Sequence, residues 1–272
     1  KPVSPPILLA RVANHLYIKS ASDFLRDRSK FLEAEVEKRT RENLAIQNAT
    51  IMVMASLAET RDSETGNHIR RTQHYVRLLA EKLRSHPRFG FYLSDETIAT
   101  LFKSAPLHDI GKVGIPDRIL LKPGRLTPEE FEVMKTHTTL GRDAIQAAED
   151  RLGAPVEFLT MAKEIALYHQ EKWDGSGYPT GAAGEDIPAS ARIMAVADVY
   201  DALISRRVYK EGMPHEKAVG IMREGRGTHF DPDVLDAFLA LQDEFLAIAE
   251  QFSDSDVDIE RKAACMSQVL EG

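Results

Sequence analysis

The sequence predicts an all-α fold, a helical bundle with a long N-terminal linker helix and one short glycine-rich loop. Apolar residues recur at helical spacing through most of the 272 residues, and alternating strand patterns are nearly absent. Glycine and proline gather in a few loops, the densest of which is 167–181, LYHQEKWDGSGYPTG. Hydrophobic residues make up 43% of the chain, as in ordinary cored proteins.

The N-terminal part is predicted to be helical but unlike the rest in composition. Residues 1–20 open with three prolines and continue amphipathically, and proline is tolerated in the first turn of a helix. Residues 21–50 are rich in charge and lack glycine and proline, which indicates a helical linker. Such a linker is either a simple exposed helix or one half of a short coiled coil that makes a homodimer.

From residue 51 onward the pattern predicts one helix after another, up to a polar tail at 253–272. We expect a bundle domain at 51–252. In LTPEEFEVMKTH, Thr127 can cap a helix that has Pro128 at its first position and Glu130 at its third, which is a capping box. The other helices are predicted at 68–84, 156–169 and 190–205, with a last long one at 231–252.

Charge and cysteine usage exclude several classes of function. The net charge of −7 argues against broad binding of DNA or of a membrane surface. No apolar run approaches the roughly 20 residues needed to span a bilayer. A lone Cys265 cannot form an internal disulfide, which favours a reducing, cytoplasmic setting. The first residues have no signal-peptide pattern and no initiator Met, so the chain reads as part of a longer protein.

Several histidines and carboxylates lie at the edges of apolar helical faces, where a metal site could form. A single histidine there is more often a core histidine, and Asp198 in its apolar helix could equally be held by a buried salt bridge. Together, however, the set favours a site for Fe, Mn, Zn, Ni or Co, because imidazole mixed with carboxylate suits these ions. The candidates are Glu64, His68, His108, Asp109, His137, His169 and Asp198.

The adjacent pair His108 and Asp109 is the most informative part of this set. An aspartate beside a histidine can bridge two ions, and two ions about 3.5–4 Å apart can activate water and clamp a phosphoryl oxygen. Lys112 follows three residues later and could neutralise a phosphate oxygen, although a solvated loop lysine is the ordinary alternative.

HDIGKVGIP at 108–116 and HQEKWDGSGYPTG at 169–181 resemble the HD-GYP family, a branch of the HD superfamily of metal-dependent phosphohydrolases. The resemblance extends over residues 49–239. It includes ETGNHIRRT, LLKPGRLTPEEFEVMKTHTTLG, ARIMAVADVYDAL, SRRVYK and GTHFDP in the family's order. It implies an HD-type bundle that hydrolyses cyclic di-GMP to pGpG, and potentially on to GMP.

The resemblance also implies roles for individual residues. The seven candidates above would be the metal ligands, with Asp109 bridging two ions and Lys112 contacting phosphate. Arg207 and Lys210 would hold the phosphates of the substrate. Tyr178 would line the substrate cleft, or would instead pack the glycine-rich loop against the bundle.

Gln170 departs from the family pattern. Members with three metal ions have a second histidine at this position, and a neutral amide oxygen is a weak ligand for transition metals. Glu64, by contrast, is the carboxylate that those members use. We therefore expect two ions, with three as the alternative, and Fe or Mn ahead of Zn, Ni or Co. A weakened third ion could leave pGpG as the product or shift preference between cyclic and linear substrates.

The first residues, KPVSPPILLARVANHL, resemble the end of a response-regulator receiver domain, a Lys-Pro followed by the final helix. This implies a two-component response regulator whose histidine kinase would act on a receiver domain upstream of the present sequence. Two alternatives to a cyclic di-GMP phosphodiesterase remain open. One is an enzyme that prefers pGpG, and the other is a weakly active module that binds cyclic dinucleotides as an effector.

Overall fold

The structure, a computed structural model, describes residues 4–60, 66–206, 211–257, 259–260 and 262–264. The chain divides into two compact units, Lys1–Thr50 and Ile51–Gly272. Among the described residues no helix is both long and apolar enough to cross a membrane.

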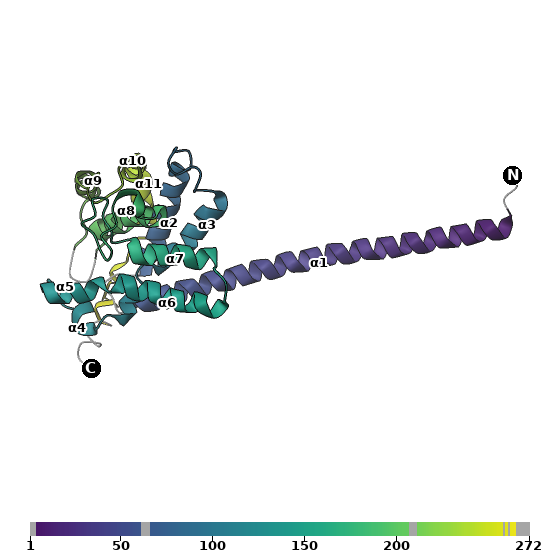
Figure 1. Ribbon diagram of the computed structural model, residues 1–272, viewed down its shortest axis with the longest axis horizontal. Helices are drawn as coiled ribbons and strands as arrows, with labels where there is room; N and C mark the ends of the chain where they lie inside the picture. Colours follow the sequence, from purple (N-terminus) through teal and green to yellow (C-terminus); the bar gives the residue numbers. More distant parts are fainter. Residues whose placement is uncertain (1–3, 61–65, 207–210, 258, 261, 265–272) are drawn as a thin grey trace. The chain divides into compact units, whose positions relative to one another are not determined.

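In the first unit, residues 5–50 are helical and belong to α1 (Pro5–Thr60) (Figure 1). The predicted helices at 1–20 and 21–50 are therefore joined without a break. Its surface carries i,i+4 ion pairs such as Arg39 Nε to Glu35 Oε1 at 2.8 Å. Large apolar side chains are also exposed along it, among them Phe24, Leu25 and Phe31.

The second unit is built from helices, and its described residues contain no strand, which confirms the all-α prediction. The only β-type pairing in the described ranges is an isolated bridge between Arg226 and Phe230. The α-helices are α2 (Gly66–Leu83), α3 (Asp95–Ser104), α4 (Asp117–Leu120), α5 (Pro128–Lys135), α6 (His137–Leu152), α7 (Glu157–Tyr168), α8 (Ala189–Ile204), α9 (His215–Glu224), α10 (Pro232–Leu239) and α11 (Gln242–Gln251). Short 3-10 helices are η1 (Ala105–Leu107), η2 (Ile110–Gly114) and η3 (Gly184–Asp186).

The main core lies around α2 and α8, which pack against each other and against α3, α7, α9, α10 and α11 (Figure 1). Its centre is aromatic: Tyr75 stacks on Phe245 with ring centroids 4.4 Å apart, and Tyr200 meets both rings edge-on. A smaller cluster of Leu107, Ile145 and their neighbours lies between α6 and α7. The main apolar core of the unit is thus built around the α2–α8 pair, and α6 contributes to the smaller cluster.

The predicted capping box at Thr127 is confirmed, but the prediction of one long helix at 231–252 is wrong. The capping box at the start of α5 is present, with the Thr127 hydroxyl accepting from Glu130 N and the Glu130 carboxylate accepting from Thr127 N. The single long helix predicted at 231–252 is instead two, α10 and α11, separated at Ala240–Leu241. No glycine or proline marks this break; Leu241 is buried in the core there, so packing overrides local propensity.

Candidate metal centre

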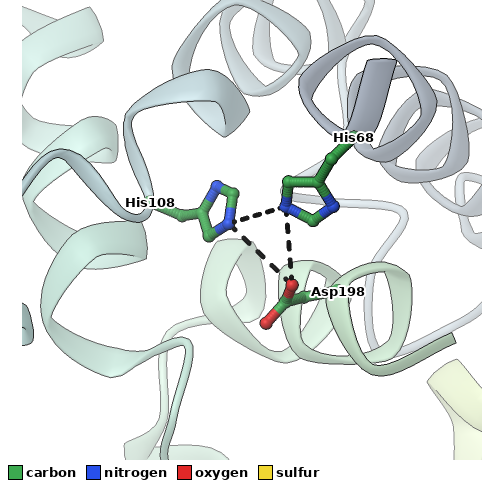
Figure 2. A group of neighbouring side chains, drawn as sticks. All are labelled: His68, His108 and Asp198. Atoms are coloured by element: carbon green, nitrogen blue, oxygen red, sulfur yellow. Dashed lines mark hydrogen bonds and ion pairs between the residues drawn. The ribbon is translucent and has the colours of Figure 1, made fainter. Parts of the chain in front are cut away.

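Three side chains from distant parts of the chain meet in the first group of potential metal ligands (Figure 2). His68 comes from the first turns of α2, His108 from the turn between η1 and η2, and Asp198 from the middle of α8. His68 Nε2 lies 3.3 Å from His108 Nε2 and 3.7 Å from Asp198 Oδ1. Such close approach of two imidazole nitrogens and a carboxylate oxygen forms a site open to a cation.

A second group of potential ligands lies beside the first and consists of Asp109, His137 and His169. Asp109 Oδ1 lies 3.3 Å from His137 Nε2 and 3.5 Å from His169 Nε2. The other oxygen of the same carboxylate, Oδ2, lies 3.3 Å from His108 Nε2 of the first group. Asp109 therefore offers one oxygen to each group, which is the arrangement of a bridging carboxylate.

A close backbone contact brings the two groups together. Gly111, in η2, packs against α6 so tightly that a Cβ there would overlap the carbonyl oxygen of His137 and lie 2.5 Å from Gly141 N. Only glycine allows this approach. The contact sets Asp109, two residues before Gly111, against His137 at the start of α6.

Hydrogen bonds of the ring nitrogens determine how the histidines point. The Nδ1 atoms of His108, His137 and His169 lie 2.9, 2.8 and 3.0 Å from the backbone carbonyls of Ala105, Met134 and Ile165. A carbonyl can only accept, so each Nδ1 carries a hydrogen and Nε2 is the ring nitrogen that faces the centre.

The electrostatics of the cluster are those of a buried site with shared charge. Burial opposes ionisation of Asp109, but Lys112 and His108 outweigh it and hold the pKa of this carboxyl well below its usual range. Burial also lowers the pKa of His108, yet Asp109 and Asp198 raise it to a net value above the ordinary one. For His137 burial dominates and lowers the pKa to about 4, so this ring is neutral and ready to act as a ligand.

Whether the residues fit a metal ion can be tested on Asp109. Its Oδ1 is buried and finds no hydrogen-bond donor of good geometry among the described residues, although it faces two Nε2 lone pairs. A buried carboxylate oxygen surrounded by acceptors is costly unless a cation lies between them. The donor set of histidines and aspartates suits a transition metal. The residues fit.

Lys112 and a small hollow lie beside this cluster. Lys112 Nζ is 2.5 Å from Asp109 Oδ2, so the lysine faces the centre and is not a solvated loop side chain. The hollow is lined by Ala55, Ala58, Glu59, Pro106, His108, Asp109, Ile110 and Lys112.

The glycine-rich loop folds over the second group. The Tyr178 ring lies edge-on to His137 with centroids 6.3 Å apart, and edge-on to Phe131 at 5.9 Å. Burial raises the pKa of its hydroxyl, and Asp109 adds to this effect. Gly177 passes so close to the backbone of Glu171 and Lys172 that no Cβ would fit.

The base of the loop is fixed by the segment before α10. Trp173 N and Asp174 N donate to the carbonyls of His229 and Thr228 at 3.1 and 2.9 Å. The Trp173 ring lies 5.4 Å from the Arg88 guanidinium and 5.8 Å from that of Arg192. Trp173 therefore packs the loop against the bundle.

Comparison with protein families identifies the fold unit that carries this centre. The model of the family described as HD domain matches residues 52–234. The chain belongs to the HD domain family. The HD domain recognised from the motifs is thereby confirmed.

Three proteins similar to this chain have names that state an activity. A "Probable cyclic di-GMP phosphodiesterase" of Vibrio cholerae is 56% identical over 256 residues, 94% of this chain and 58% of the relative. The "Cyclic di-GMP phosphodiesterase response regulator RpfG" of Xanthomonas campestris is 40% identical, covering 93% and 63%. A "Cyclic di-GMP phosphodiesterase" of Thermotoga maritima is 38% identical, covering 94% and 68%. The chain thus spans about three fifths to two thirds of these relatives.

The HD domain brings together most of the residues that the sequence singled out. His68, His108, Asp109, His137, His169 and Asp198 converge, with Lys112 and Tyr178 beside them. Glu64, Arg207 and Lys210 lie outside the described residues. Gln170 follows His169, and its backbone carbonyl accepts from Tyr178 N at 3.3 Å.

Sequence reasoning missed two buried charged residues behind the centre. Asp201 lies one helical turn after Asp198, and Arg71 lies three residues after His68. Burial raises the pKa of Asp201, but hydrogen bonds from His68 and Arg71 outweigh it, so the carboxylate is ionised. The signal was present: an aspartate inside the apolar stretch RIMAVADVYDAL needs a partner, and helical spacing places it beside Asp198.

Proposed function

We propose that this HD domain is a metal-dependent phosphodiesterase that hydrolyses cyclic di-GMP to pGpG, with continued hydrolysis to GMP as the alternative end of the reaction. The observation that carries the proposal is the pair of His/Asp groups joined by the two oxygens of Asp109. The printed names of relatives at 38–56% identity support the same substrate class.

His68, His108 and Asp198 would hold one divalent ion, and His137 and His169 would hold a second, with Asp109 as their shared ligand. Two such ions lower the pKa of a bound water and neutralise charge on a phosphoryl group. Fe or Mn is the first expectation, with Zn, Ni or Co as alternatives, because the same donors serve all five.

The chain's own residues would position the phosphodiester and stabilise its charge. Lys112, held beside Asp109, would donate to a non-bridging phosphate oxygen. A fixed cation in such a buried site stabilises the developing negative charge more strongly than it would in water. Tyr178 would border the substrate with its ring edge over the second group. Glu64 as a ligand, and Arg207 and Lys210 as phosphate contacts, remain predictions from the motifs.

The identity of residue 170 affects how many ions bind and whether pGpG or GMP is the final product. An amide in place of a histidine would weaken a third ion, so two ions and accumulation of pGpG are expected. The same departure supports the second candidate functions, an enzyme that prefers pGpG or a weakly active cyclic dinucleotide effector. The position of Lys112 beside the centre favours turnover, because a pure binding module has no need of a group that stabilises developing charge.

For the whole protein we propose a cytoplasmic two-component response regulator. Residues 1–20 would end a receiver domain acted on by a histidine kinase, 21–50 would be the linker, 51–252 the catalytic domain and 253–272 a tail. The name of the Xanthomonas campestris relative supports this arrangement. The exposed apolar residues of α1 support a homodimer formed through the linker helix.

The decisive experiment supplies Mn or Fe during purification and measures metal per chain and the products of cyclic di-GMP over time. Two ions with accumulating pGpG would agree with the proposal, and three ions with GMP as the end product would contradict the role given to Gln170. Asp109→Ala should abolish both metal binding and turnover. Retained turnover in that variant would refute the bridging role.

A further inference from the structure

The four histidines of the centre differ in the hydrogen-bond partner of Nδ1, the ring nitrogen that faces away from the ligand groups. Three of them place Nδ1 against a backbone carbonyl, as described above. His68 alone among the four places Nδ1 against a carboxylate, with Asp201 Oδ2 at 2.9 Å. A carboxylate partner fixes the tautomer as a carbonyl does, and it also makes the imidazole a stronger ligand.

Asp201 is itself held with little freedom. The side chain is 1% exposed, and its two oxygens accept from Arg71 Nε at 2.6 Å and from one Arg71 terminal nitrogen at 2.9 Å. The Ser205 hydroxyl donates to the same Oδ2 at 3.0 Å. This two-pronged contact with a planar guanidinium fixes the orientation of the carboxylate behind His68.

Arg71 continues the network to the C-terminal side of the bundle. Its remaining terminal nitrogen donates to the Phe252 carbonyl at 2.9 Å and to Asp254 Oδ2 at 2.9 Å. Asn67, one residue before His68, donates to the other oxygen of Asp254 at 2.9 Å.

Aromatic contacts hold the same short segment, 252–254, on α2. The Phe252 ring stacks on His74 with centroids 4.9 Å apart, and the Arg70 guanidinium lies 4.6 Å from that ring. The segment after α11 thus touches four residues of α2, including the one that orients Asp201. None of these contacts reaches the second group of ligands.

We propose that Asp201 and Arg71 are positioning residues for the ion held by His68, His108 and Asp198, and that segment 252–254 tunes this ion through them. The inference rests on the proposed function, because it takes the centre to be a metal site. It predicts that the two ions are unequal: disturbing the network weakens the first ion and leaves the ion of His137 and His169 unchanged.

The test titrates metal-free protein with Co²⁺, whose visible absorption reports the ligands of each ion, in competition with a chelator. Asp201→Asn removes the charge behind His68 while keeping the size of the side chain. Asp236→Asn is the matched control, since it removes an exposed aspartate paired with Arg226 at 2.7 Å, far along the sequence from the centre. Thermal unfolding of each variant shows that it is folded.

We expect Asp201→Asn to weaken one of the two Co²⁺ ions by about 10–100-fold and to change its absorption bands, because loss of a carboxylate behind a ligating histidine has effects of this size. The other ion and the control should match the wild type. Equal weakening of both ions, or wild-type binding of both, would overturn the proposal.

A second variant covers the case in which Asp201→Asn does not fold. Asp254→Ala removes the ion pair between Arg71 and the C-terminal segment and leaves the hydrogen bond from Arg71 to the Phe252 carbonyl in place, and we expect the chelator to extract the same ion faster. An unchanged extraction rate would overturn the role of the segment. Failure of wild-type protein to hydrolyse cyclic di-GMP would contradict the proposed function, and the Co²⁺ titration tests the positioning network separately.

Discussion

Replacing Gly111 with alanine should disconnect the two halves of the metal centre. A Cβ at this position would lie 2.5 Å from Gly141 N and overlap the His137 carbonyl. The nearest atom is the His137 carbonyl oxygen at 1.9 Å, and non-bonded heavy atoms prefer separations near 3.5 Å, so η2 and α6 must move apart by about 1.5 Å. Overpacking of this kind costs roughly 1–3 kcal/mol of unfolding free energy.

The same displacement should separate two ligands of the centre, since Asp109 and His137 lie on opposite sides of the contact. A misplacement of about 1 Å is enough to reduce activity on the order of 100-fold. Urea unfolding and metal content per chain measure the two effects. Gly220→Ala is the matched control: beyond the backbone of its own helix, no atom lies within 4 Å of the position that a Cβ would take. This helical glycine should gain up to about 1 kcal/mol of stability on replacement.

Wild-type unfolding and full metal content in Gly111→Ala would refute the role given to this contact. Loss of stability without loss of metal would contradict the proposed effect of this contact on the centre. Equal destabilisation by Gly220→Ala would show that glycine replacement in general, and not crowding at η2, causes the effect.

Three further predictions concern stability. Thr127→Ala removes the capping box of α5 and should cost about 1 kcal/mol in urea unfolding; no change would mean that the cap is unimportant. Leu101→Ala, in the fully buried core, should cost about 2–5 kcal/mol by the same assay, and a cost near zero would contradict its packing. Asp231→Asn should cost about 3 kcal/mol at pH 7, because it breaks the buried pairs with Arg88 and Arg192. Burial raises the pKa of Asp231, but hydrogen bonds from those arginines lower it below its ordinary value, so its contribution is complete above about pH 4 and is lost as the pH falls through the folded pKa. The gap between Asp231→Asn and wild type should therefore shrink in acid, and a gap that stays constant to about pH 3 would contradict this account.

Much of the fold was accessible from local patterns, because helices leave a periodic signal. The capping residues Thr127 and Glu130 located the start of α5, and the apolar face of 190–205 located α8. The break between α10 and α11 was not accessible. It lies in the continuous helical pattern around Leu241, and burial of that side chain, a tertiary effect, sets the bend.

The candidate centre was accessible as a list of residues but not as a geometry. A carboxylate such as Asp198 on an apolar helix needs a partner, and only together with the four histidines and Asp109 does it indicate a metal site. Which histidine joins which carboxylate depends on contacts between distant residues, such as Gly111 with His137, that no local pattern encodes. The same is true of Arg71. In the sequence it lies in a charged stretch and resembles a surface residue, and only the packing of α8 against α2 shows that it pairs with the buried Asp201.

The two halves of the centre should also differ in local stability, because they rest on different parts of the core. His68 and Asp198 lie on α2 and α8, which supply large buried side chains such as Tyr75 and Tyr200 to the main cluster. His137 begins α6, whose apolar contribution is little more than Ile145, and whose contact with α7 also relies on the ion pair between Lys163 and Glu149. Segments with few buried apolar contacts open at lower free energy than the global transition. We therefore expect backbone amides of α6 to exchange with deuterium faster than those of α2 and α8 in metal-free protein, and metal to slow exchange most in α6. Equal protection of the three helices would mean that the second group of ligands is as rigid as the first.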